Sequence, residues 1–163
     1  MRMVSVVVCL LFAGLFSVAE NERETKLMSQ SQGAVRFVKS ENLPPSSGYS
    51  QAVEIRRGRI IYVAGQVAVD RSGKVVGEGD MRAQAQQTFE NLKAALEASG
   101  ARFENVVKLN YYFSDITQLT VVREVRDKFI NTANPPASTA VEVKRLFREP
   151  FLIEVEAVAV VPE

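Results

Sequence analysis

Strand-like alternation of apolar and polar residues recurs along the chain and is interrupted by two longer helical repeats. Short β-branched runs bounded by Gly, Pro, Asn or Ser are typical of strands. The tight-turn pair Arg57-Gly58 separates two such runs and predicts an antiparallel hairpin between them. The predicted strands cover residues 34–39, 52–56, 59–64, 106–113, 135–143 and 152–161.

Two stretches instead repeat with the helical period. Asp80 can cap a helix whose apolar stripe ends before Gly100, a residue type favoured just past helix ends. A second helix is predicted over residues 115–131, and Asn134-Pro135-Pro136 stops it. The two apolar stripes are Ala85, Phe89, Leu92 and Leu96, and Val122, Val125 and Phe129. Because each helix has one stripe, both can cover one face of a single sheet, which is an α+β architecture.

The last two predicted strands place carboxylates among apolar residues. Glu142 lies in the first strand, and Glu154 and Glu156 lie in the second. Strict alternation puts Glu154 and Glu156 on the same face as Val158 and Val160. That face is either a solvated edge or the wall of a cleft or subunit interface, and the pattern leaves both readings open.

Composition limits the chemistry more than it limits the fold. The 163 residues suit one domain, with no His, no Trp and a single cysteine, Cys9. Ser-His-Asp and Cys-His catalysis and His-ligated metal sites are therefore excluded. The net charge is +1 and no basic stripe is present, so binding of nucleic acid is not predicted. Catalysis would depend on carboxylates, Arg, Lys, Tyr, Ser, Thr or backbone groups.

The N-terminus has the composition of an export signal. Arg2 precedes an apolar run over residues 4–16, and Ser-Val-Ala19 ends it with small residues. We expect residues 1–19 to be a signal peptide, 20–33 a mobile leader and 34–163 the folded domain. The mature protein would then be periplasmic or secreted, without stable membrane association. An uncleaved signal anchor and a cytoplasmic protein that starts at Met28 are the alternatives.

A set of short motifs resembles one known family. In order, they are Gly48-Tyr49-Ser50-Gln51, Ala64-Gly65-Gln66, Asp70 with Gly73, Gln84, Gln87, Asn91, Leu92, Leu96, Gly100, Val107-Lys108, Phe113-x-Asp115, residues 137–143 and residues 153–159. In this order and spacing they resemble the reactive-intermediate deaminases, the RidA or YjgF family. The resemblance implies a chorismate-mutase-like fold and a homotrimer with clefts between subunits. It also implies hydrolysis of enamines and imines, such as 2-aminoacrylate, to a 2-keto acid and ammonia, with no metal or organic cofactor.

One motif departs from the family pattern. The active branch of the family reads Pro-Ala-Arg-Ser before Val-Glu-Val, whereas this chain reads Pro136-Ala137-Ser138-Thr139. The family arginine would hold the substrate carboxylate in a bidentate, charge-assisted pair. Loss of a buried charged partner costs about 2–5 kcal/mol, so we expect little activity on 2-imino acids. Arg145 and Arg148 either replace the missing charge or belong to a solvated basic loop.

The resemblance assigns candidate roles residue by residue. Glu156 matches the carboxylate associated with positioning water and is the candidate catalytic residue, with a solvated strand carboxylate or an intersubunit ion pair as the alternative. The candidate substrate-binding residues are Tyr49, Gly65, Ser138 and Thr139. We expect a small-molecule ligand between subunits, with weak hydrolase activity on a C–N substrate. A non-catalytic binding or holdase-like protein is the alternative, and ribonuclease activity is disfavoured by the absence of both His and a basic patch.

Overall fold

The computed structural model describes residues 33–163, and residues 34–163 form one compact unit. The predicted signal peptide and residues 20–32 of the predicted leader lie outside the described residues. Within the described part, no helix is long and apolar enough to cross a membrane. The elements are β1 (Val35–Val38), β2 (Ala52–Ile55), β3 (Arg59–Gln66), α2 (Met81–Ala98), η1 (Phe103–Asn105), β4 (Val106–Phe113), η2 (Ile116–Gln118), α3 (Leu119–Arg126), β5 (Ala137–Glu142) and β6 (Ile153–Val161).

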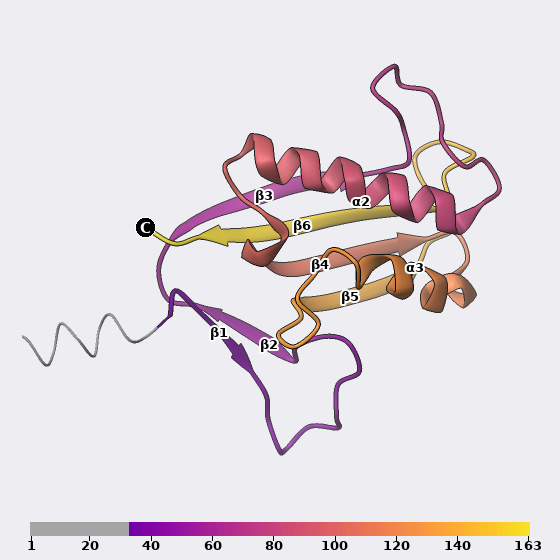
Figure 1. The fold of residues 1–163 in the computed structure, drawn as a ribbon. Coiled ribbons are helices and arrows are strands. Elements are labelled where there is room, and N and C mark those ends of the chain that lie inside the picture. Colours follow the sequence, from indigo (N-terminus) through magenta and orange to yellow (C-terminus); the bar gives the residue numbers. More distant parts are fainter. Residues whose placement is uncertain (1–32) are drawn as a thin grey trace, which may run out of the picture. The chain divides into compact units, whose positions relative to one another are not determined.

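A four-stranded sheet in the order β3-β6-β4-β5 carries the two helices on one face (Figure 1). Strand β6 runs antiparallel to both of its neighbours, whereas β4 and β5 are parallel. A parallel pair needs a crossover connection, and the segment containing α3 provides it. The predicted α+β fold, with two helices on one face of a sheet, is confirmed.

The predicted hairpin between residues 52–56 and 59–64 is wrong. Strand β2 pairs with β1 in a separate two-stranded sheet, and β3 pairs with β6. Gly58 turns the chain with a φ of +116°, and a Cβ there would lie 2.7 Å from the Val161 carbonyl oxygen. The turn therefore packs against the end of β6, where β3 buries Ile61 and Val63 in the core. Burial of these apolar side chains outweighs the local turn preference.

The first helix agrees with its prediction, and the second is shorter. The Asp80 carboxylate accepts a hydrogen bond of 3.1 Å from the Ala83 amide and begins α2. The predicted stripe from Ala85 to Leu96 is buried in the core. The second predicted helix divides into η2 and α3, which ends at Arg126. Phe129 lies beyond that end but still stacks on Phe89, with ring centroids 5.3 Å apart.

Candidate functional site

Successive residues of β5 point to opposite faces of the sheet. Ser138 is in register with the buried Leu109 and lies on the helix side. Thr139 is in register with Asn110 and lies on the side away from the helices, the outer face. These two predicted substrate-binding residues are therefore not brought together within one chain.

Ser138 and Tyr49 line a small cavity between β5 and α3. The cavity has a volume of about 30 Å³, and we call it the α3 cavity. The structure thus brings together two residues that are 89 positions apart in the sequence. Its lining residues are Tyr49, Tyr111, Leu119, Val122, Arg123, Arg126, Ser138 and Ala140.

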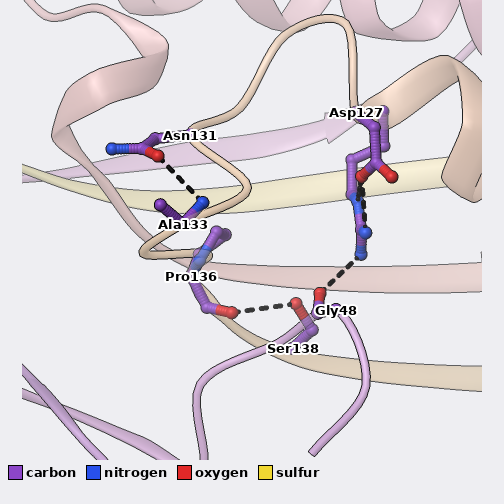
Figure 2. Close-up of polar contacts among 7 residues, drawn as sticks. Gly48, Asp127, Asn131, Ala133, Pro136 and Ser138 are labelled. Atoms are coloured by element: carbon purple, nitrogen blue, oxygen red, sulfur yellow. Dashed lines mark hydrogen bonds and ion pairs between the residues drawn. The ribbon is translucent and has the colours of Figure 1, made fainter.

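The loop that carries Tyr49 is fixed on both sides of that residue. Gly48 offers its carbonyl oxygen to Nη1 of Arg126 at 2.9 Å (Figure 2). The Ser50 hydroxyl donates to the Pro135 carbonyl at 2.6 Å, and the Ser50 amide donates to the Pro136 carbonyl at 3.2 Å. Gly48 has a φ of +74°, so glycine suits this turn. Tyr49 is therefore held against the start of β5.

Arg126 is a charged residue of the cavity that the sequence analysis missed. It is only 4% exposed, and its Nε and Nη2 donate to one oxygen of Asp127 at 2.9 and 2.6 Å. A usable signal was its spacing, because Arg126 lies four residues after Val122 and so shares the buried stripe. The two predicted replacements do not line the cavity: Arg145 is exposed, and Arg148 lies over the Phe151 ring at 5.0 Å.

Tyr111 contributes a neutral hydroxyl to the same cavity. Its side chain is 4% exposed, and its oxygen has no hydrogen-bond partner among the described residues. Burial raises the pKa of Tyr111 to about 12, although the nearby Arg126 and Ser138 act to lower it. The hydroxyl is therefore a protonated donor at neutral pH.

Glu156 belongs to a different group of residues, on the outer face. Its Oε1 accepts hydrogen bonds from Asn110 Nδ2 at 2.7 Å and from the Tyr112 hydroxyl at 3.1 Å. The bond to Glu156 raises the pKa of Tyr112. Thr139 and Glu156 are both in register with Asn110 of β4, one on each side of that strand. The Thr139 hydroxyl accepts a hydrogen bond from Lys108 Nζ at 2.7 Å. Two neutral donors thus hold the candidate catalytic carboxylate in place.

Gly65 lies beside a second carboxylate of the outer face. A Cβ at Gly65 would lie 1.9 Å from Oε1 of Glu154, so the glycine lets that side chain lie against the backbone of β3. Burial raises the pKa of Glu154, and the charge of Glu156 raises it further. The outer face therefore holds two neighbouring carboxylates together with Lys108, whereas the α3 cavity holds two arginines.

Comparison with known proteins identifies the family. Residues 39–161 match the family model described as endoribonuclease L-PSP. The chain is 39% identical over 122 residues to a RutC family protein of Pyrococcus horikoshii, and the alignment covers 74% of this chain and 93% of the relative. It is 36% identical over 128 residues to the 2-iminobutanoate/2-iminopropanoate deaminase of Salmonella typhimurium, and this alignment covers 77% of this chain and 97% of the relative.

A crystal structure of a Rid family protein from Yersinia pestis has a TM-score of 0.74 and 35% identity, over 79% of this chain and 100% of that one. The chain belongs to the endoribonuclease L-PSP family, which is the RidA/YjgF family. The family predicted from the motifs is therefore confirmed, as is its fold.

Proposed function

We propose that this protein is a RidA-like homotrimer that binds a small metabolite between subunits and hydrolyses an enamine or imine, with low activity. Relatives named 2-iminobutanoate/2-iminopropanoate deaminase support the reaction class. The observation that carries the proposal is the division of the candidate residues between two faces. Tyr49 and Ser138 lie in the α3 cavity, whereas Thr139 and Glu156 lie on the outer face.

A second copy of the chain would complete the site. Strand β5 is an edge strand, so the outer face of a neighbouring copy can approach Tyr49 and Ser138 there. The outer face of β3 also exposes apolar side chains, since Tyr62 is 80% exposed and Ile60 is 45% exposed. Large exposed apolar groups on a sheet are typical of interfaces. Sedimentation of the purified protein tests the trimer, and a monomer at micromolar concentration would contradict it.

The proposed reaction places water near Glu156. The carboxylate takes a proton from the water as the oxygen adds to the imine carbon, and the nitrogen is protonated in turn. The hydroxyl of the resulting carbinolamine then loses its proton, its amino nitrogen gains one, and the C–N bond breaks, which gives the keto product and ammonia. Asn110 and Tyr112 orient Glu156 for this step through the bonds described above.

Ser138 favours a second candidate function, ligand binding without turnover. Its hydroxyl donates to the Pro136 carbonyl at 3.3 Å and has no charge to offer a substrate. A protein that binds a metabolite but cannot orient it for hydrolysis would show ligand-dependent stabilisation without product.

Ammonia release from freshly generated 2-aminoacrylate separates these candidates. We expect the wild type to release ammonia faster than the uncatalysed reaction, and Ser138→Arg is measured beside it with the oligomeric state checked. If only the Arg variant is active, the cleft is intact and the wild type has another ligand. If neither trimer releases ammonia, the imine-hydrolase proposal is wrong.

We also propose that the chain is exported and cleaved after Ala19. The support is the residue pattern of the first 19 positions. The intact mass of the protein purified from its own cells tests this proposal. A mass that corresponds to a start at residue 20 is expected, whereas a start at Met1 or Met28 would contradict it.

A further inference from the structure

A groove among the helical segments is separate from both the α3 cavity and the outer face. It is bordered by the second half of α2, by η1 with the residue before it, and by the turn after α3, and we call it the η1 groove. Its volume is about 270 Å³. None of its lining residues lines the α3 cavity, so a ligand here would not touch Tyr49 or Ser138.

Two phenylalanine rings form the apolar part of the groove. Phe103 of η1 and Phe129 after α3 have ring centroids 5.3 Å apart, and Phe129 also stacks on the buried Phe89 of α2. Phe103 is buried, whereas Phe129 is half-buried. The core thus fixes both rings while Phe129 keeps part of its surface open to the groove. An aromatic ligand can pack on such a ring in an offset or edge-to-face arrangement.

Charged side chains of both signs surround these rings without pairing. Three basic and two acidic residues line the groove, and they are Lys93, Arg102, Lys128, Glu97 and Glu104. All five are exposed, and none forms an ion pair within residues 33–163. Lys93 and Glu97 are four residues apart on α2, but a lysine that precedes a glutamate is the less favourable order for a helical pair. The groove therefore offers cations and carboxylates that a ligand can bind.

This mixture of charges limits the chemistry of the ligand. A phosphate or another simple anion would lie beside two carboxylates, and a simple cation would lie beside three basic groups. A zwitterion avoids both repulsions, because its ammonium binds a carboxylate while its carboxylate binds a lysine or an arginine. A water-sized group occupies roughly 15–30 Å³, so the groove holds about 9–18 such groups, which matches a free aromatic amino acid.

We propose that the η1 groove binds a free aromatic amino acid, with its ring on Phe129 and its charged groups on the oppositely charged side chains around that ring. Glu97 and Glu104 accept from the ammonium, and Arg102 and Lys128 donate to the carboxylate. Hydration alone would satisfy these charges but would leave the open part of the Phe129 ring in water, whereas the ligand covers it. The site is separate from the proposed catalytic residues, so its failure would leave the proposed function unaffected.

Fluorescence anisotropy of L-tryptophan tests this inference, because the protein has no tryptophan of its own. Titration of the purified protein into L-tryptophan should raise the anisotropy along a saturable curve, and L-phenylalanine should compete. Tryptamine, which lacks the carboxylate, and indole-3-propionate, which lacks the ammonium, should each bind at least about threefold more weakly. L-Alanine, which lacks the ring, should not displace the probe.

Two variants locate the binding site. The double variant Glu97→Gln/Glu104→Gln should weaken tryptamine binding at least about threefold and tighten indole-3-propionate binding, since the negative charge that attracts one and repels the other is gone. Phe129→Leu should weaken L-tryptophan binding about threefold to tenfold, because an apolar side chain remains but the ring contact is lost. Arg71→Met, in an exposed turn, is the control and should bind L-tryptophan like the wild type. Thermal unfolding of each variant verifies that the fold persists.

The opposite changes for the two charged analogues separate ligand binding from a structural role of Glu97 and Glu104. A structural role would change the affinities for tryptamine and indole-3-propionate in the same direction, or not at all, and either result overturns the inference. Absence of L-tryptophan binding to the wild type overturns it too. Unchanged L-tryptophan binding by a folded Phe129→Leu protein would place the amino acid elsewhere and has the same consequence.

Discussion

The α3 cavity and the outer face differ in charge, in hydrogen-bonding capacity and in their use of the same strands. Adjacent residues of β5 contribute to both, Ser138 to the cavity and Thr139 to the outer face. In the cavity, buried donors lie around an arginine that one carboxylate neutralises. On the outer face, two carboxylates lie close enough for Glu156 to raise the pKa of Glu154.

The contrast shows that the two faces of one sheet provide different chemical environments. The helix side is closed by α3 and the Tyr49 loop, so it can bury an arginine and fix its partners. The outer face has no helix above it, and Glu154 and Glu156 are half-buried there.

The largest expected effect tests the outer face. Glu156→Ala should lower ammonia release at least about a hundredfold, because it removes the proposed base and leaves Asn110 and Tyr112 without their acceptor. Initial rates with 2-aminoacrylate measure the loss, and sedimentation verifies the trimer. Glu124→Ala, at an exposed position of α3, is the control and should keep wild-type rates. Full activity in the Glu156 variant would show that another group activates water.

The next effect tests the charge of the cavity. Asp127→Asn should lower the free energy of unfolding by about 1–3 kcal/mol, because the buried Arg126 loses its ion-pair partner. Urea unfolding measures the loss. Glu124→Gln breaks an exposed pair with Arg82 and should change stability by only about 0–1 kcal/mol. Unchanged stability in Asp127→Asn would contradict a stabilising ion pair between Arg126 and Asp127.

A smaller effect tests the close contact on the outer face. Gly65→Ala should cost about 1–2 kcal/mol, because its Cβ would lie 1.9 Å from Glu154 Oε1 and force that side chain to move. In a Glu154→Ala background the same substitution should cost much less, since the obstructing atoms are gone. Urea unfolding of the wild type, the two single variants and the double variant measures the coupling free energy between Gly65 and Glu154. Strict additivity would mean that the two residues do not compete for space.

The smallest effect is a pH dependence from Glu154. Its pKa is raised from 4.5 by burial and by Glu156, so the folded protein holds this proton more tightly than the unfolded chain. Stability from this group is therefore present at low pH and is lost as pH rises from 4.5 through the higher folded value. Glu154→Gln should gain more stability relative to wild type at pH 7 than at pH 4. Urea midpoints at the two pH values check this, and a larger gain at pH 4 would refute it.

Local patterns predicted the framework well and its connections less well. Strand β4 and the first helix match their predictions because both bury a regular apolar stripe. The Arg57-Gly58 pair has the residues of a hairpin turn, but β3 gains its burial from α2 and β6, and only the tertiary structure shows this. The second helix ends early at Arg126, and its predicted Phe129 reaches the core from outside the helix.

The candidate site shows the same limit. Motif order singled out both Tyr49 and Ser138, and the structure brings them together in the α3 cavity. Arg126 escaped notice because an arginine in a helix is usually solvated, and its burial depends on Gly48, which lies 78 positions earlier. The separation of Ser138 from Thr139 follows from strand alternation, but the register with β4 decides which of them faces the helices.

The hydrogen bond from Ser50 to Pro135 joins residues that are 85 positions apart. The pairing of β3 with β6 closes loops of comparable length, so sequence separation alone does not set the order of assembly. The Ser50 contact differs because it lies against the edge strand β5, outside the four-stranded sheet. Local opening is easiest at such an edge, so amide exchange at Ser50 should be faster than in β4 while the sheet stays folded.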